Sequence, residues 1–261
     1  VWQGGLETLA AELADGRLAL QGPALAATGI TGRYDRRSGA RLVVESLHHA
    51  AERALWAPLA LTAQAPPDLA GATLTASLAG GSGLTVAEAE ARRRPDGRWA
   101  LDFRTPRLAL GEELAVAGLS PLLADFRAGG VLALKGGIVL PGGQGRAELL
   151  LENVSLARGP LQGRGLHGVV TFDSLLPLST PPEQELALAA IDSALPLTDG
   201  RLRFRVLPAG TMRIESLRAR LAQGVVRARD QILDPMADSN RLVLRAEGLS
   251  LPALAALSPL E

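Results

Sequence analysis

The chain has 261 residues with 27 acidic and 27 basic side chains, and it contains no cysteine. A net charge of zero gives no overall field to attract nucleic acid or an anionic membrane, and the lack of cysteine excludes disulfides and thiolate metal sites. Only 3% of the residues are aromatic, whereas 47% are hydrophobic. Because large rings usually anchor a deep core, this composition favours a thin, extended sheet.

Short runs of alternating polar and apolar residues, bounded by Gly, Pro, Asn or Asp, predict β-strands along most of the chain. The expected strands are Leu42–Glu45, Leu59–Ala63, Ala72–Leu78, Leu84–Ala91, Val131–Leu134, Ala147–Asn153, Val225–Arg229 and Arg241–Glu247. Helices are expected only as short segments, at Leu6–Leu13, His48–Trp56, Pro121–Phe126 and Pro252–Leu257.

One element occurs three times, as Asp15-Gly16-Arg17, Asp96-Gly97-Arg98 and Asp199-Gly200-Arg201. Because glycine takes positive φ at little cost, each Asp-Gly pair is expected to close a tight turn before a strand. The predicted fold is therefore mainly β: an elongated, strongly twisted antiparallel sheet, built from successive hairpins and curled into a trough, with few short helices.

No linker-like stretch divides the sequence, so residues 1–261 are expected to be one elongated β-rich fragment of a longer protein. The final pair, Leu260-Glu261, is interpreted as a vector remnant. No apolar run has the length needed to cross a bilayer.

The strands that follow Asp199 are expected to have one charged and one apolar face. The apolar positions are Leu202, Phe204, Val206, Met212, Ile214, Leu242 and Leu244. Two interpretations remain open: an opposing sheet or helix covers these side chains, or they line an open trough that lipid closes. A one-residue slip in register would exchange the two faces.

The segment Thr180-Pro181-Pro182-Glu183-Gln184 interrupts this pattern. Proline cannot donate to a sheet ladder and restricts the residue before it, so the segment is expected to be a rigid crossover at a sheet edge. It would alternatively dock a partner or shape the rim of a groove.

Few residues are candidates for chemistry. His48 and His49 would lie near Glu52 on a helix, but His167 is the only further histidine, and a zinc site needs three ligands in fixed geometry. The cluster Arg92-Arg93-Arg94 is expected to be a solvated hairpin tip, with contact to an anion or a lipid headgroup as the alternative. It has no interleaved aromatic residues for stacking bases. We therefore expect no catalysis, no metal, no cofactor and no nucleic-acid binding.

The stretch from Gly165 to Ser216 resembles the C-terminal region of the YdbH-like family, which belongs with the AsmA- and TamB-like envelope proteins. Matching residues include Gly165, Gly168, Phe172, Pro177, Leu178, Thr180, Pro181, Pro182, Gln184, Ile191, Asp192, Gly200, Phe204, Ile214 and Glu215. The resemblance is best over residues 140–251. It departs at Gln223-Gly224, where a Gly-Gly pair is expected.

The resemblance implies a non-enzymatic segment of a periplasmic bridge, β-taco-like in form, that carries phospholipid between the inner and outer membranes. It further implies an inner-membrane anchor, membrane contact through parts outside this sequence, and other envelope proteins as partners. An older label for this region is dicarboxylate transport; it would need arginines converging in a pocket, whereas the arginines of this sequence are expected to alternate along exposed strand faces. The alternative function is a closed β-sandwich or solenoid that serves as a structural or interaction module of the envelope.

Overall fold

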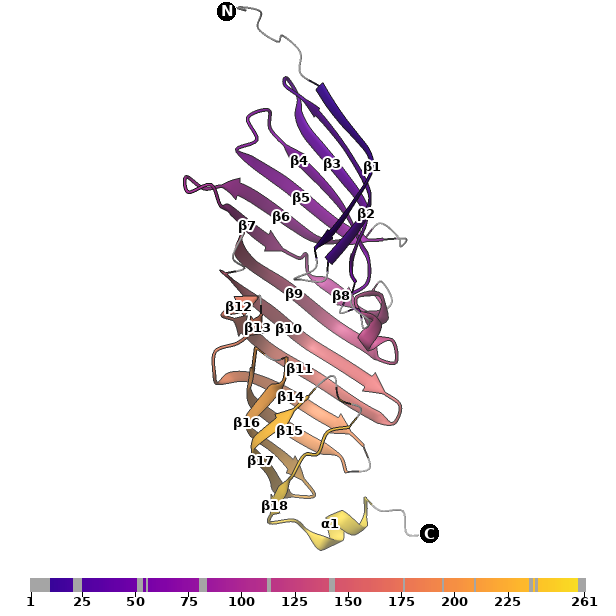
Figure 1. The fold of residues 1–261 in the computed structure, drawn as a ribbon. Helices are drawn as coiled ribbons and strands as arrows, with labels where there is room; N and C mark the ends of the chain where they lie inside the picture. The colour runs from indigo at the N-terminus through magenta and orange to yellow at the C-terminus, as the bar shows by residue number, and fades with distance from the viewer. Residues whose placement is uncertain are drawn as a thin grey trace, which may run out of the picture. The chain divides into compact units, whose positions relative to one another are not determined.

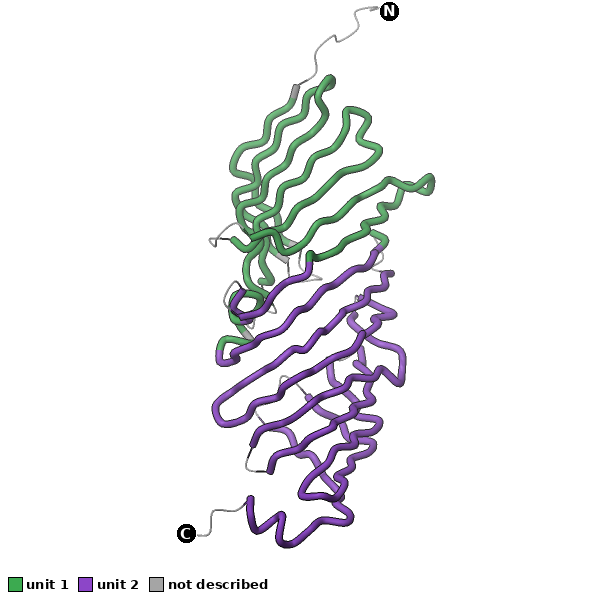
Figure 2. Tube along the Cα trace, turned by 180° about the vertical axis from the view of Figure 1, so that it is seen from behind, with its two compact units in different colours: residues 1–106, 117–124, 139–141 green, residues 107–116, 125–138, 142–261 purple. Residues whose placement is uncertain are grey.

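The computed structural model describes residues 10–20, 25–50, 54, 56–79, 84–111, 114–140, 144–175, 177–193, 195–208, 210–234, 237 and 239–257. The chain forms two compact units (Figure 2). Unit 1 comprises residues 1–106, 117–124 and 139–141, and unit 2 comprises residues 107–116, 125–138 and 142–261. Strands dominate both units, which confirms the mainly β prediction.

Unit 1 contains seven described strands that pair in chain order, each antiparallel to the next (Figure 1). They are β1 (Ala10–Leu20), β2 (Leu25–Asp35), β3 (Gly39–His49), β4 (Leu59–Ala65), β5 (Gly71–Leu78), β6 (Thr85–Arg93) and β7 (Trp99–Arg104). In two of the connecting turns an aspartate side chain accepts from backbone N–H groups: Asp35 from Arg37 and Ser38, and Asp68 from Ala70.

Unit 2 contains a longer sheet in the order β9, β10, β11, β14, β15, β16, β17, β18, with β8 paired to β9. Its strands are β8 (Leu108–Leu110), β9 (Arg127–Leu140), β10 (Gln144–Arg158), β11 (Leu161–Phe172), β14 (Gln184–Asp192), β15 (Leu197–Val206), β16 (Met212–Leu221), β17 (Gly224–Leu233) and β18 (Arg245–Glu247). A separate hairpin, β12 (Ser174–Leu175) and β13 (Leu178–Ser179), lies between β11 and β14 in the chain. A helix, α1 (Leu251–Ala255), follows the last strand.

Two of the three Asp-Gly elements are β-bulges, so the turn prediction is wrong for them. Asp15 and Asp199 have φ of 49° and 50° and lie inside β1 and β15, where the register shifts by one residue. Only Asp96-Gly97 closes a turn, in which the Gly97 N–H donates to the Arg94 carbonyl at 2.9 Å. An Asp-Gly pair supplies the left-handed backbone that both a turn and a bulge require, and here the flanking residues continue the strand ladder.

The helix predictions fail where strand pairing continues. Residues 10–13 belong to β1, and the rest of Leu6–Leu13 lies outside the described residues. His48 and His49 end β3, where they pair with Ala26 and Leu25 of β2. Helical spacing over one or two turns is a weak signal beside a complete antiparallel ladder.

Two other helix predictions lie closer to the structure. The expected helix at Pro121–Phe126 is a single 3-10 turn over Pro121–Leu123. The C-terminal helix is confirmed as α1, and the Ser250 side chain caps it by accepting from the Ala253 N–H.

Candidate functional site

The apolar face of unit 2 is the candidate site, and it consists of the apolar side chains that β10, β11, β14, β15, β16 and β17 direct to the same side. One row of directly paired positions crosses all six strands: Leu151, Gly168, Leu186, Leu202, Leu217 and Ala228. Because side chains alternate between faces, the positions two residues away extend this surface along each strand.

A buried cluster forms at the middle of this face. Val170, Leu186 and Phe204 are buried, and Phe204 is only 5% exposed. Partly buried side chains pack against them: Leu149, Leu151, Leu166, Phe172, Leu202, Val206 and Met212. Unit 2 therefore has a partly closed core whose outer side chains keep contact with solvent.

Five of the seven sequence-predicted groove residues lie on this face. Leu202, Phe204, Val206 and Met212 belong to the cluster, and Ile214 is buried opposite Phe204 on β16. The other two, Leu242 and Leu244, lie in an irregular segment before β18, where they are 39% and 43% exposed. The predicted strand Arg241–Glu247 is thus shortened to Arg245–Glu247.

A β-bulge at Glu215 keeps Ile214 on the apolar face. Arg203 pairs with Ser216 while the next residue, Phe204, pairs with Ile214, so Glu215 is the extra residue of β16. Without that bulge, Ile214 would point to the opposite face.

Sequence reasoning missed the contributions of β10, β11 and β14 to this face. Leu149, Leu151, Val170, Phe172 and Leu186 were not singled out as groove residues. The alternation of apolar residues in each strand was the available signal. Their convergence on Phe204 depends on β14 pairing with β11 across the intervening β12–β13 hairpin.

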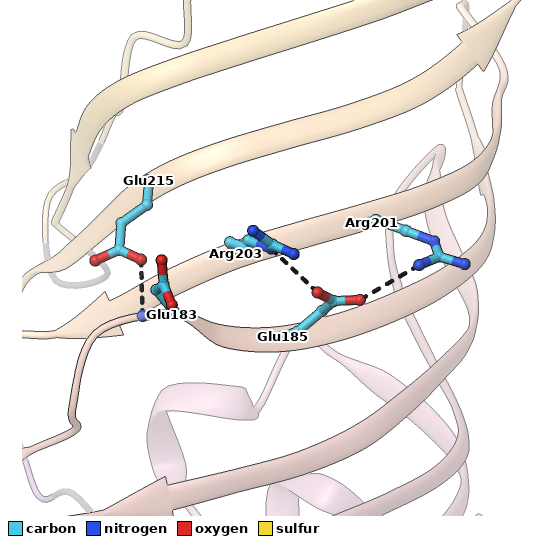
Figure 3. Close-up of polar contacts among 5 residues, drawn as sticks. All are labelled: Glu183, Glu185, Arg201, Arg203 and Glu215. Atoms are coloured by element: carbon cyan, nitrogen blue, oxygen red, sulfur yellow. Dashed lines mark hydrogen bonds and ion pairs between the residues drawn. The ribbon is translucent and has the colours of Figure 1, made fainter.

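The opposite face of unit 2 is charged. Glu185 on β14 lies between Arg201 and Arg203 of β15, at 3.6 and 3.1 Å (Figure 3). Arg213 pairs with Asp230 at 2.9 Å and Arg227 with Glu247 at 2.6 Å. These exposed pairs contribute little energy individually, at most about 1 kcal/mol, but they mark this face as the solvated one.

The Thr-Pro-Pro segment leads from the β12–β13 hairpin into β14. Thr180 is 5% exposed, and its backbone N–H donates to the Val206 carbonyl at 3.1 Å. Its hydroxyl in turn accepts from the Val206 N–H at 2.8 Å. Thr180 therefore fastens the crossover to the end of β15.

Further hydrogen bonds hold the two ends of this crossover. The Gln184 side-chain oxygen accepts from the Thr171 N–H at 2.7 Å, and Ser179 donates to Asp173 at 2.7 Å. Glu183, with φ of 59°, donates its N–H to the Glu215 carboxylate at 2.8 Å (Figure 3).

The remaining motif residues have different positions. Pro177 and Leu178 lie at the tip of the hairpin, where Leu178 is 46% exposed, while Pro181 and Pro182 join β13 to β14. Gly200 lies in β15, buried at the bulge that begins with Asp199. The segment connects two strands, as the crossover interpretation expects, but β14 lies between β11 and β15 and is not an edge strand.

Unit 1 also has an apolar face, on which large and small side chains alternate from strand to strand. A row of paired positions runs across β3 to β7: Leu42, Ala63, Leu74, Ala89 and Phe103. Leu42 is 39% exposed, and the other four are half-buried. This face is more open than its counterpart in unit 2.

The histidines lie in strands. The ring centroids of His49 and Trp56 are 5.1 Å apart, and the Nδ1 atom of His48 lies 3.4 Å from the Ser46 hydroxyl oxygen. Within the described ranges, no group of three His, Cys, Asp or Glu side chains is arranged to hold a metal ion. In the same ranges, no helix combines the length and hydropathy needed to span a membrane.

Comparison with known proteins gives one result for the entire chain. The family model described as "YdbH-like: Intermembrane phospholipid transport protein YdbH" matches residues 1–261. No curated protein matches the sequence. Because the match covers every residue, including the region before residue 140, the chain belongs to the YdbH-like family.

Proposed function

We propose that this chain is a non-enzymatic segment of a periplasmic bridge that carries phospholipid between the inner and outer membranes, with acyl chains lying on the apolar face of unit 2. The family's printed name refers to intermembrane phospholipid transport. The observation that carries the proposal is an apolar face six strands wide whose large side chains Leu202, Val206 and Met212 stay partly exposed.

The dimensions of the face suit an acyl chain. Six strands at about 4.8 Å spacing span about 24 Å, whereas the tails of one leaflet occupy about 15 Å of a bilayer. Moving a two-chain phospholipid through water exposes about 30 methylene groups and costs on the order of 25 kcal/mol. A surface that keeps contact with the tails removes much of that barrier without chemistry.

The proposal predicts that lipid binds the apolar face and not the charged one. The experiment purifies the protein without detergent and measures bound phospholipid by native mass spectrometry and lipid extraction. Leu202→Asp places a charge among the partly buried side chains of the face. Val169→Asp is the matched control, because Val169 is 47% exposed and lies on β11 between the apolar positions Gly168 and Val170.

We expect the Leu202→Asp variant to lose most of its bound phospholipid while its circular dichroism stays that of the parent, and the Val169→Asp variant to retain its lipid. A parent protein that carries no lipid and binds no apolar dye would contradict the proposal. That result would instead favour a structural or docking module of the envelope.

A further inference from the structure

Four arginines form a single row across the charged face of unit 2. Arg201 of β15 pairs with Arg218 of β16, Arg218 with Arg227 of β17, and Arg227 with Arg245 of β18. Directly opposed residues in an antiparallel sheet have their Cβ atoms about 5 Å apart, and like charges at these positions destabilise the pairing. Anions beside the row would offset this repulsion.

The protein supplies only part of that compensation. Glu185 lies 3.6 Å from Arg201, and Glu247 lies 2.6 Å from Arg227. Among the residues that the structure describes, Arg218 and Arg245 have no carboxylate partner. The same holds for Arg229, which lies beside the row on β17.

A cavity of about 390 Å³ lies at the unpaired arginines. Its lining consists of Arg227, Ala228, Arg229, Gln231, Val243, Arg245 and Glu247. It exists because β18 pairs with β17 only from Arg245 to Glu247. Before Arg245 the chain leaves the ladder, and the Val243 N–H instead donates to the Gln231 side chain at 3.3 Å.

We propose that this cavity binds a phosphate-bearing anion through the guanidinium groups of Arg229 and Arg245, with Arg227 as a third contact. Guanidinium groups present a planar fork of donors that matches phosphate oxygens, and such charge-assisted bonds are about twice as strong as neutral ones. The volume is at the lower end for ligand sites, which suits a phosphate with a glycerol-sized substituent rather than a whole diacyl lipid.

The carboxylate of Glu247 limits the net charge of the ligand that the cavity would bind. Its carboxylate lines the cavity and holds Arg227, so one negative charge is already present at the site. A second charge on the ligand is repelled by this carboxylate, which favours a singly charged phosphodiester over a doubly charged phosphate. A lipid headgroup and free phosphate both present phosphate oxygens to the arginines. Comparing the affinity for a soluble diester with that for inorganic phosphate distinguishes these two sources.

The test titrates the complete chain with glycerophosphoglycerol, a soluble phosphodiester, and in parallel with inorganic phosphate, both by calorimetry at low ionic strength. Arg229→Gln combined with Arg245→Gln is the test variant, because both side chains are exposed and substitutions at exposed positions usually change stability little. The matched control is Arg17→Gln with Arg94→Gln, which removes two exposed arginines of unit 1 that lie away from this cavity.

We expect the parent to bind the diester with a dissociation constant of about 1 mM, and the test variant to bind about tenfold more weakly. The control should bind as the parent does. Stronger binding of the diester than of inorganic phosphate identifies a headgroup as the source, and the reverse order identifies free phosphate. Equal affinity in parent and test variant, or an equal loss in both double variants, would overturn the proposal.

This inference does not depend on lipid carriage, because the arginines lie on the face opposite to Leu202. The Leu202→Asp variant should keep its affinity for the diester. Loss of lipid with retained diester binding would thus separate the two proposals.

Discussion

In both units, polar and apolar residues alternate along the strands, but the apolar side chains differ in size between the units. In unit 1 the apolar row alternates large and small residues, so Leu42 and Leu74 are separated by Ala63. In unit 2 the equivalent row has leucine on four of its six strands. A leucine side chain has three more carbon atoms than alanine. At about 0.8 kcal/mol for each buried methylene, burying it therefore stabilises the fold by about 2.4 kcal/mol more.

Exposure follows from this difference. Leu186 in unit 2 is 7% exposed because leucines on neighbouring strands and Phe204 surround it, whereas Leu42 in unit 1 is 39% exposed. Side-chain volume, not alternation, therefore decides whether a sheet face buries a cluster or stays open. The comparison predicts that equivalent substitutions cost more in unit 2.

The largest expected effect is that of removing an aromatic ring from each face. Phe204→Ala leaves a cavity in the buried cluster and should cost about 4 kcal/mol. Phe103→Ala in unit 1 removes a half-buried ring and should cost about 2 kcal/mol. Hydrogen exchange followed by mass spectrometry measures both, because it separates the peptides of the two units. Equal losses would break the comparison.

A second prediction concerns polar burial. Thr180→Val removes the hydroxyl that accepts from the Val206 N–H, leaves that donor unsatisfied, and should destabilise unit 2 by about 2 kcal/mol. Thr75→Val, at an exposed position of β5, should have almost no effect. Denaturant unfolding followed by circular dichroism checks both variants. A loss at Thr75 equal to that at Thr180 would show that the buried hydrogen bond is not the cause.

The elements that sequence could predict are those with local signals. Alternation across Leu202, Phe204 and Val206 correctly indicated a strand with one apolar face, and the helix expected at Pro252–Leu257 is observed as α1. Asp15 and Asp199 carried a turn signal that the longer strand ladders overrode, which local sequence does not reveal.

Long-range register was beyond the reach of the sequence. The buried cluster needs β14 to pair with β11 across an intervening hairpin, and the arginine row needs three registers to coincide. Each shift of one residue would move every side chain to the other face. The bulge at Glu215 produces such a one-residue shift in register. No distinctive residue type at this position predicts the bulge from sequence.

A third prediction tests the turn between β16 and β17, where the sequence departs from the expected Gly-Gly pair. Ala222 and Gln223 both have positive φ, 46° and 68°, in a two-residue turn that favours glycine or asparagine. Gln223→Gly should stabilise unit 2 by about 1 kcal/mol, because a left-handed backbone is unfavourable for a residue with a Cβ atom.

The control for that turn lies in unit 1. Gln64→Gly, in β4 and paired with Arg41 and Thr73 on both sides, should destabilise the protein by about 0.5–1 kcal/mol, because glycine there has only an entropic cost. Thermal unfolding of both variants gives the two signs directly. Destabilisation by both would show that the backbone of Gln223 is not strained.

The smallest expected effect is a pH dependence in unit 1. The Asp35 carboxylate accepts from the backbone N–H groups of Arg37 and Ser38 at 2.8 and 3.0 Å, and these bonds lower its pKa below the ordinary value of 3.8. A carboxyl whose pKa is lower in the folded state stabilises that state above the unfolded pKa, and the contribution disappears as the pH falls through the folded pKa.

Carbon-detected NMR should show Asp35 titrating below 3.8, and Asp35→Asn should reduce the loss of stability of unit 1 at acid pH. The Trp56 and Trp99 fluorescence follows this unit selectively, since unit 2 contains no tryptophan. An Asp35 pKa at or above 3.8 would mean that the turn does not hold the carboxylate in solution, and the difference between the units would then rest on their apolar faces alone.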